Sequence, residues 1–338
     1  MTEKNKMYIC VLTSLPDANE PPYDPSPHMN GYEWKQHTVD SNHNEAAMRK
    51  LINEGVDVFL NLSDGTPDDP YAGVGLVKAL ERVGAAYTGA DPKFFDPSRQ
   101  QMKAAARKSN VPTPASVFID NVEDFDKALR KLSFPMLVKP PHGYASVGIT
   151  RDSRVENADQ LKVQLEAEIK AFGRALVEEF IEGREFTCLI AEDPDDPAHP
   201  ITFKPVEFKF PEGESFKHYN MKWLDYNKMI VVPVTDRRIE KTLREQTLRV
   251  FQTLNGNGYA RCDYRMDSSG TIHMLEINPN CGIFYPPGDP GSADYCLLND
   301  KVNHRKFMKM IIRSAFQRQA INRLKMKEKV EEKEMAYA

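Results

Sequence analysis

A predicted β-hairpin constrains this chain most strongly. Two segments in which polar and apolar residues alternate flank an Asp-Ser-Ser-Gly turn at residues 267–270, which is typical of a hairpin. Side chains two positions apart on a strand share a face, so we expect Arg261 to lie beside Asp263 on the first strand. In the same way, Glu276 lies beside Asn278 on the second. The opposite face then carries Cys262, Tyr264, Leu275 and Ile277.

The polar face of this hairpin presents a cation, two carboxylates and an amide. Hard divalent ions such as Mg²⁺ prefer a few carboxylate and amide oxygens and take their remaining ligands from water and phosphate. The alternative is a solvated outer face of mixed charge, which many antiparallel sheets show. The hairpin alone does not distinguish a metal-binding face from a solvated one. The order of the other features along the chain is needed to decide.

Composition excludes several classes of protein. The chain has 338 residues, 41% of them hydrophobic, which suggests two or three domains or subdomains. A net charge of −4 gives no general affinity for nucleic acid or for an anionic membrane. No apolar run approaches the ~20 residues that span a bilayer, and the first residues lack the pattern of a signal peptide. The odd number of widely spaced cysteines favours reduced thiols in a cytoplasmic protein over a disulfide framework or a zinc site; they are Cys10, Cys188, Cys262, Cys281 and Cys296.

The first 95 residues predict a parallel α/β layer, because strand-like and helix-like segments alternate along them. We expect strands at 7–15, 56–62 and 85–88 and helices at 45–54 and 71–83. The proline-rich stretch 16–43 is predicted to be a long loop or lid. Its three histidines, which could reach a substrate or simply lie on the surface, are His28, His37 and His43.

The next segment contains a candidate phosphate site. A helix at 98–110 carries Arg99 and Lys103 on one face, either as ligand-binding cations or as a solvated basic stripe. After a strand at 117–119 and a helix that Asn121 caps, a buried strand ends in Lys139 and is followed by a small-residue loop. Loop amides and an ammonium group together can hold a phosphate, although an ordinary hairpin turn is the competing interpretation.

The rest of the chain is also predicted to contain strands, helices and loops in turn. Consecutive acids after a buried strand at 175–181 could pair with the edge of a base and with ribose hydroxyls. The apolar stripe of a helix at 301–324 indicates core packing, and the charged residues 325–334 are expected to fray. The remaining expected elements are helices at 156–172 and 237–254, strands at 184–190 and 201–208, and loops at 211–227 and 281–291.

Taken in order, four motifs resemble the ATP-grasp superfamily and, within it, the D-alanine–D-alanine ligase group. They are Val-Lys-Pro with a Ser-Val-Gly loop, Val-Glu-Glu-Phe-Ile-Glu-Gly-Arg-Glu, a lysine loop, and Arg-x-Asp with Leu-Glu-Ile-Asn-Pro. The likeness covers about residues 56–280. It implies an N-terminal parallel α/β domain at 1–95 and a two-subdomain ATP-grasp fold. The subdomains are the small or central one at 96–183 and the C-terminal one at 184–324, which holds the hairpin, and a charged tail follows at 325–338.

The resemblance implies a ligase in which ATP phosphorylates a carboxylate and an amine attacks the acyl phosphate. It implies ATP and two Mg²⁺ ions as cofactors, with Mn²⁺ as a substitute. Asp263, Glu276 and Asn278 match metal ligands, and Arg261 matches the arginine that stabilises the tetrahedral intermediate. With Arg261, the resemblance implies Lys222 and Ser146 as catalytic residues. The residues that it implies bind the nucleotide are Arg99, Lys139, Glu178, Glu179, Ile181 and Glu185. Of these, Arg99 stands where a lysine is usual, and Ser146 and Lys222 belong to loops over the phosphates.

Departures from the family pattern concern the acceptor half of the site. The family's glutamate after the first strand has no counterpart in residues 11–16, and its serine and tyrosine partners fall at Ala145 and Trp223. Residues 280–283 lack the family's pattern for the substrate carboxylate. We therefore expect small carboxylate and amine substrates, with D-alanine in doubt, no nucleic-acid or membrane partner, and a homodimer as an option. The alternatives are a catalytically silent ATP-binding regulator and a structural protein on this scaffold.

Overall fold

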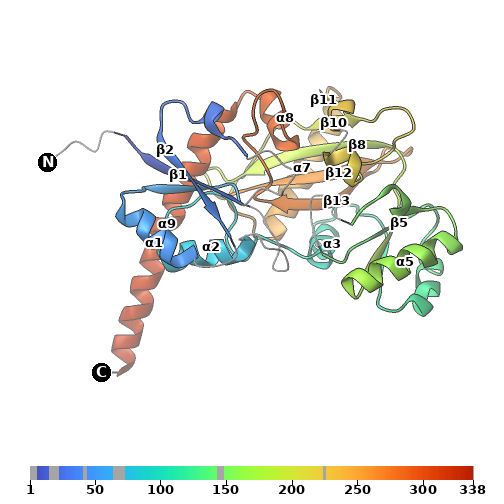
Figure 1. Ribbon diagram of the computed structural model, residues 1–338, viewed down its shortest axis with the longest axis horizontal. Helices are drawn as coiled ribbons and strands as arrows, with labels where there is room; N and C mark the ends of the chain where they lie inside the picture. The colour runs from blue at the N-terminus through green and yellow to red at the C-terminus, as the bar shows by residue number, and fades with distance from the viewer. Residues whose placement is uncertain are drawn as a thin grey trace.

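Three β-sheets, each built from a separate stretch of the chain, organise the structure (Figure 1). The computed structural model describes residues 6–14, 23–40, 44–63, 73–142, 148–223 and 226–337. In Figure 1 the N-terminal sheet lies on the left, the second sheet lies at the lower right with helix α5 (Ala158–Phe172), and the third sheet lies above it. Helix α3 (Arg99–Lys108) is drawn between the N-terminal sheet and the second sheet.

The N-terminal sheet is parallel, as predicted. Its central strand β1 (Tyr8–Ser14) pairs with β2 (Glu33–Val39) and β3 (Val58–Asn61), and helices α1 (Asn44–Asn53) and α2 (Gly73–Arg82) accompany it. The predicted strand at 85–88 is a single bridge between Phe59 and Tyr87. The prediction of a loop through 16–43 was wrong at β2. This edge strand is only partly buried, so its mixed side chains gave no continuous apolar signal.

The second sheet is antiparallel and has a core of its own. Its strand order is β4 (Ser116–Ile119), β7 (Ala175–Glu179), β5 (Met136–Lys139) and β6 (Arg154–Val155). Helix α5 (Ala158–Phe172) packs on it through Leu161 and Leu165. The predicted helix after Asn121 is a 3-10 turn (Val122–Phe125) followed by α4 (Asp126–Leu129), and Asn121 makes no side-chain cap.

The third sheet is also antiparallel and carries most of the C-terminal half. Along it run β11 (Ile230–Pro233), β10 (Val206–Lys209), β8 (Arg184–Ala191), β12 (Tyr259–Met266) and β13 (Ile272–Pro279), with β9 (Ile201–Thr202) paired to β8. Helix α7 (Arg237–Thr253) packs on one face through Leu243 and Val250. Helices α8 (Ser292–Leu298) and α9 (His304–Tyr337) pack on the other.

Four short elements and one long one differ from expectation. The loop predicted at 211–227 contains α6 (Tyr219–Trp223) and a 3-10 turn (Tyr226–Lys228), and neither β11 nor α8 was predicted. Helix α9 continues to Tyr337 and extends away from the other elements (Figure 1), so the prediction that it frays after residue 324 was wrong. Its Lys- and Glu-rich end has high helix propensity. Among the described helices, none has both the length and the apolar character that crossing a membrane requires.

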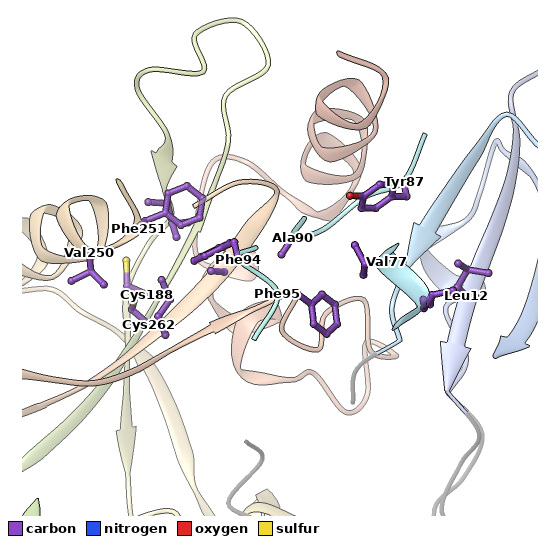
Figure 2. Close-up of a cluster of buried hydrophobic side chains, with 14 of the residues drawn as sticks. Leu12, Val77, Tyr87, Ala90, Phe94, Phe95, Cys188, Val250, Phe251 and Cys262 are labelled. Carbon is purple, nitrogen blue, oxygen red and sulfur yellow. The ribbon is translucent and has the colours of Figure 1, made fainter. Parts of the chain in front are cut away.

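One hydrophobic core joins the N-terminal and third sheets. Figure 2 shows Leu12 and Val77 at one end of this cluster and Cys188, Cys262 and Val250 at the other. Phe94 and Phe95 lie between the two groups, and the ring of Phe94 meets that of Phe251 edge to face at 5.2 Å. The second sheet shares none of these residues. The domain boundaries at residues 95 and 183 remain predictions.

Two glycines allow the backbone of the N-terminal domain to touch the end of the hairpin. Gly89, at φ +87°, lies so close to Asn280 that an added Cβ would be 1.8 Å from its Oδ1. Gly258, at φ +62°, would bring a Cβ to 2.1 Å from the carbonyl oxygen of Gly89. The Tyr87-Thr88-Gly89 motif therefore fixes the position at which β12 begins and β13 ends.

We predict that Gly258→Ala destabilises the protein by roughly 4 kcal/mol, because backbone must move in addition to the strain of the left-handed conformation. Gly84 is the matched control: its φ is +67° and nothing lies within 4 Å of an added Cβ. Gly84→Ala should cost about 1 kcal/mol. Urea unfolding measures both, and equal losses would show that the contact with Gly89 carries no energy.

Candidate functional site

The candidate site lies on one face of the third sheet, where strand register places the polar residues of the hairpin together. Asp263 on β12 lies opposite Thr187 on β8 and Glu276 on β13. Two residues before Asp263 on β12, Arg261 lies opposite Asn278 on β13. Since directly paired residues project from the same face of an antiparallel sheet, all four predicted hairpin residues share one face.

A β-bulge in the hairpin changes which residue reaches the core. The register shifts so that Asp263 pairs with Glu276 but Tyr264 pairs with Met274, and Leu275 is the extra residue. Met274 is buried in the core beside Tyr264, whereas Leu275 is only partly buried. The prediction that Leu275 faces the core was therefore wrong, because simple alternation does not hold across a bulge.

Asp263 is held as an anion inside the protein. Arg261 donates to both of its carboxylate oxygens, from Nε at 2.9 Å and from Nη2 at 2.8 Å. The hydroxyl of Thr187 donates to the Oδ1 of Asp263 at 2.6 Å. Burial alone would raise the pKa of Asp263, but the positive charges of Arg261 and Lys217 outweigh it and lower the pKa to about 2. This carboxylate is therefore ionised at neutral pH.

Glu276 connects the hairpin to helix α3 (Arg99–Lys108). The Nη1 of Arg99 lies 3.2 Å from Oε2 of Glu276. The side-chain amide of Asn278 donates to Asp263 at 3.1 Å and, more weakly, to Glu276 at 3.4 Å. Two carboxylates and an amide thus converge on one spot, with an arginine on either side.

Lys139 and Lys103 share one buried carboxylate in the second sheet. The Nζ of Lys139, at the end of β5, is 2.7 Å from Oε1 of Glu178, and the Nζ of Lys103 is 3.4 Å from Oε2. Burial lowers the pKa of Lys139 to about 8 although Glu178 opposes the shift. For Glu178, burial acts to raise the pKa, but Lys103 and Lys139 prevail and lower it to about 2. Lys139 is therefore a cation at neutral pH with a proton it can lose in mild base.

Helix α3 links the two sheets. Arg99 and Lys103 lie four residues apart on one helical face, and they contact Glu276 of the third sheet and Glu178 of the second, respectively. Both side chains are buried, at 6% and 3% exposure, so they are not the solvated basic stripe that the sequence left open. The ion pairs of Glu178, Glu276 and Asp263 thus follow one another from the second sheet through α3 to the third sheet, and we call this series the line from Lys139 to Asp263.

The end of β7 and the residues that follow it contain the predicted adenine contacts, Glu179 and Ile181. The N–H of Glu179 donates to the carbonyl of Ala115 at 3.0 Å, and its carboxylate accepts from the N–H of Ser133 at 3.2 Å. The N–H of Ile181 has no partner among the residues that the structure describes. Glu185, which begins the site face of β8, is buried and pairs with Arg265 and with Lys217, each at 3.2 Å.

Sequence reasoning missed Thr187, Lys217 and Arg265. Arg265 and Thr187 each lie two positions along a strand from a predicted site residue, so the period of two could have found them. Lys217 lies in a loop and gave no such signal. Two predicted residues cannot be assessed: Ser146 lies outside the described residues, and Lys222 has a described backbone in α6 but no described side chain.

The residues present fit Mg²⁺ and a polyphosphate. Among the described side chains, no group of three His, Cys, Asp or Glu could hold a metal ion unaided. Two carboxylates and an amide suit instead a Mg²⁺ ion that takes further ligands from phosphate and water. Six basic side chains contact four carboxylates in and beside this line; they are Arg99, Lys103, Lys139, Lys217, Arg261 and Arg265. Basic groups gathered in this way suit an anionic ligand.

Comparison with known proteins identifies relatives for most of the chain. The family described as "D-ala D-ala ligase C-terminus" matches residues 111–285. D-alanine–D-alanine ligase B of Chromobacterium violaceum is 28% identical over 243 residues, which cover 71% of this chain and 75% of that protein. The D-alanine–D-alanine ligase of Lawsonia intracellularis is 30% identical over 235 residues, covering 69% of this chain and 72% of that protein.

Solved structures show the same fold. The D-alanine–D-alanine ligase of Bacillus anthracis in complex with ATP superimposes with a TM-score of 0.70 at 21% identity, covering 94% of this chain and 99% of that one. The D-alanine–D-alanine ligase of Coxiella burnetii gives 0.71 at 14% identity, covering 98% and 99%. The predicted combination of a parallel α/β domain with antiparallel ATP-grasp sheets is confirmed.

We predict that Glu178→Gln lowers the free energy of unfolding by about 3 kcal/mol, because it leaves two buried ammonium groups without a counter-ion. Because the pKa of Glu178 is lowered in the folded state, this stabilisation is present above about pH 4.5 and is lost as the pH falls toward 2. Glu45→Gln is the control, since Glu45 pairs with Arg49 and Arg82 at the surface and should matter little. Similar losses in urea unfolding at pH 7 for both variants would contradict the prediction.

Proposed function

Because this chain belongs to the D-alanine–D-alanine ligase family of ATP-grasp enzymes, we propose that it joins a small carboxylic acid to an amine through an acyl phosphate. Family membership makes it an ATP-dependent ligase that forms C–N bonds and uses Mg²⁺. The acyl-phosphate route, the number of ions, the individual residue roles and the substrates are the proposal. The observation that carries it is the line of buried ion pairs from Lys139 to Asp263.

That line suits phosphoryl transfer. Little covalent help is needed from the protein in such a reaction, but the phosphates have to be positioned and their charge neutralised. Lys139 and Arg99 would contact the phosphates from the second sheet and α3, while Asp263, Glu276 and Asn278 would hold two Mg²⁺ ions. Bound Mg²⁺ would supply charge neutralisation and alignment of the transferred phosphoryl group. The same oxygen ligands would accept Mn²⁺.

The nucleoside end of ATP would lie beside the segment after β7. We assign the adenine edge to the backbone of Glu179 and Ile181, which the unpaired N–H of Ile181 supports, and the ribose hydroxyls to Glu185. The Glu178 carboxylate, held by two lysines, supports the nucleotide by fixing Lys139. Ser146 and Lys222 are assigned to the loops over the phosphates, whose closure would protect the acyl phosphate from water.

Arg261 would stabilise the oxyanion that forms when the amine attacks. It is buried, and its pairing with Asp263 raises its already high pKa although burial opposes the shift, so it carries a charge at any working pH. A guanidinium aimed at developing charge in a dry site can lower a barrier by about 3 kcal/mol. This residue favours a catalyst over the silent ATP-binding alternative, because binding ATP alone requires no such cation.

The acceptor half of the site is proposed to differ from that of the relatives. The segment after the hairpin is fixed to this chain's own N-terminal residues: His28 bonds the carbonyl of Tyr285 at 2.8 Å, and Tyr23 bonds that of Ile283. Buried Asp294 accepts from the N–H groups of Phe284 at 2.8 Å and Gly291 at 3.0 Å. We therefore propose amino acids or other small acids and amines as substrates, without assuming D-alanine.

The five cysteines are free and buried, which supports the proposal of a reducing, cytoplasmic location. Burial raises the pKa of Cys281 to about 12, although the charge of Arg261 opposes the shift. This thiol is therefore not a nucleophile at neutral pH. A homodimer remains a prediction from the sequence.

We predict amine-dependent ADP formation by the purified chain with Mg²⁺ and ATP across a panel of amino-acid pairs that includes D-alanine. Glu276→Gln is the blank and should lower the rate by at least about a hundredfold, because it removes a metal ligand. ATP binding without turnover on any pair would favour the silent regulator. Failure to bind ATP would support the structural-protein alternative.

We also predict a pH dependence that reports on Lys139. With its pKa lowered to about 8, the ammonium is charged below that pH and neutral above it. In the alkaline limb, kcat/KM for ATP should therefore fall by about tenfold per pH unit. Lys139→Arg keeps its charge and should lose this limb while remaining active. An unchanged limb in this variant would assign the titration to another group.

A further inference from the structure

A buried threonine on β8 contacts the carboxylate of Asp263. Thr187 is fully buried, at 0% exposure, and strand register places it directly opposite Asp263 of β12. Side chains two apart on a strand share a face, so Glu185 precedes Thr187 on the site face of β8. Leu189 and Ala191 follow it and belong to the core that includes α8 and α9. Thr187 is therefore the last polar residue of this face before the core.

The hydroxyl of Thr187 has two acceptors within reach but only one proton to donate. The Oδ1 of Asp263 lies at 2.6 Å and the carbonyl oxygen of Cys262 at 3.2 Å. A hydrogen bond to an ionised acceptor is shorter and stronger than one to a neutral acceptor. The proton of Thr187 is therefore directed to Asp263, and the hydroxyl is more than a polar group satisfied by the backbone.

This bond completes the set of donors around Asp263. Arg261 donates from Nε to Oδ1 at 2.9 Å and from Nη2 to Oδ2 at 2.8 Å, and Asn278 donates to Oδ2 at 3.1 Å. A carboxylate accepts about four hydrogen bonds, two at each oxygen. Both donors to Oδ1 are buried groups, whereas the longest of the four bonds comes from the half-buried Asn278 and ends at Oδ2.

Oδ2 is also the oxygen that lies toward the second carboxylate of the site. The amide of Asn278 that donates to Oδ2 donates to Oε1 of Glu276 as well, at 3.4 Å. Asp263 and Glu276 are directly paired across β12 and β13. A cation bound by both carboxylates would therefore take Oδ2 of Asp263 rather than Oδ1, which Thr187 and Arg261 occupy.

We propose that Thr187 is a positioning residue for the divalent-cation site, whose hydroxyl holds Oδ1 of Asp263 so that Oδ2 is presented toward Glu276 and Asn278. This inference rests on the proposed function, which assigns those three residues to Mg²⁺. Valine has the same branched shape as threonine without the hydroxyl, so Thr187→Val removes this bond and changes little else.

The test is calorimetric binding of ADP to the full chain, first in EDTA and then over a series of Mg²⁺ concentrations. The wild type should bind ADP more tightly as Mg²⁺ is added. In Thr187→Val, the Mg²⁺ concentration that gives half of this gain should rise by about tenfold, because the partner of a metal ligand contributes about ten- to a hundredfold to metal affinity. The affinity for ADP in EDTA should stay within about twofold of the wild type.

Two further variants separate positioning from a structural role. Thr187→Ser keeps the hydroxyl and should restore the Mg²⁺ response. Thr247→Val is the matched control and should leave both measurements unchanged, because Thr247 is also fully buried but bonds the hydroxyl of Tyr264 at 2.8 Å, in the core on the opposite face of the sheet. Should Thr187→Val fail to fold, Thr187→Cys, whose thiol is a weak donor, should shift the Mg²⁺ response in the same direction.

Each other outcome overturns the inference. An equal loss of ADP affinity in EDTA would show that Thr187 supports the fold rather than the cation site, and a loss that Thr187→Ser does not restore would assign the effect to packing. A wild type that binds no ADP, or binds it equally with and without Mg²⁺, would overturn the proposed function as well. A normal wild-type response to Mg²⁺ with an unaffected Thr187→Val overturns only this inference.

Discussion

The arrangement of this protein depends on a charged contact that a hydrophobic core would not ordinarily tolerate. Glu178 is buried between Lys139 and Lys103, and Arg99, one helical turn from Lys103, reaches Glu276. Taking such groups out of water costs several kcal/mol each, and only close pairing offsets that cost. The second sheet has its own core and shares none with the other two. Helix α3 therefore holds the second sheet at the site through ion pairs. The same ion pairs thus determine both the geometry of the site and the position of the second sheet.

The sequence was sufficient wherever a strand or helix has a single simple period. The strands that end at Lys139 and at Glu179, the helix with Arg99 and the hairpin with Asp263 were all found in this way, because each has one apolar face and a polar end. The parallel N-terminal sheet followed from the alternation of elements. The period of a strand or helix does not show which residues contact each other. The position of Glu178 in the sequence, for example, does not indicate that its carboxylate contacts two lysines rather than a base.

Most of the failures have the same physical origin. Strand β2 is incompletely buried and of mixed composition, so its sequence does not separate from that of a loop. Strand β11 carries a short β-branched run, which is a strand signal that the sequence analysis did not use. Leu275 was misplaced because a bulge inserts one residue into an otherwise regular alternation. Lys217 and the short helices α6 and α8 owe their positions to tertiary contacts that span many residues along the chain. Except at β11, the determining interaction is non-local, and a local pattern cannot report it.

The loop before α6 also connects the second and third sheets. Tyr219, the first residue of α6, donates its N–H to the carbonyl of Ile149 at 2.8 Å. Arg151, two residues after Ile149, forms an ion pair with Glu214. Arg154 donates to the hydroxyl of Ser215 at 3.2 Å. The segment before β6 and the loop before α6 thus touch while Lys217, from that same loop, reaches Glu185. One loop therefore contacts the second sheet's side through Tyr219 and Glu214 and the third sheet through Lys217, so this loop joins the two sheets in addition to helix α3.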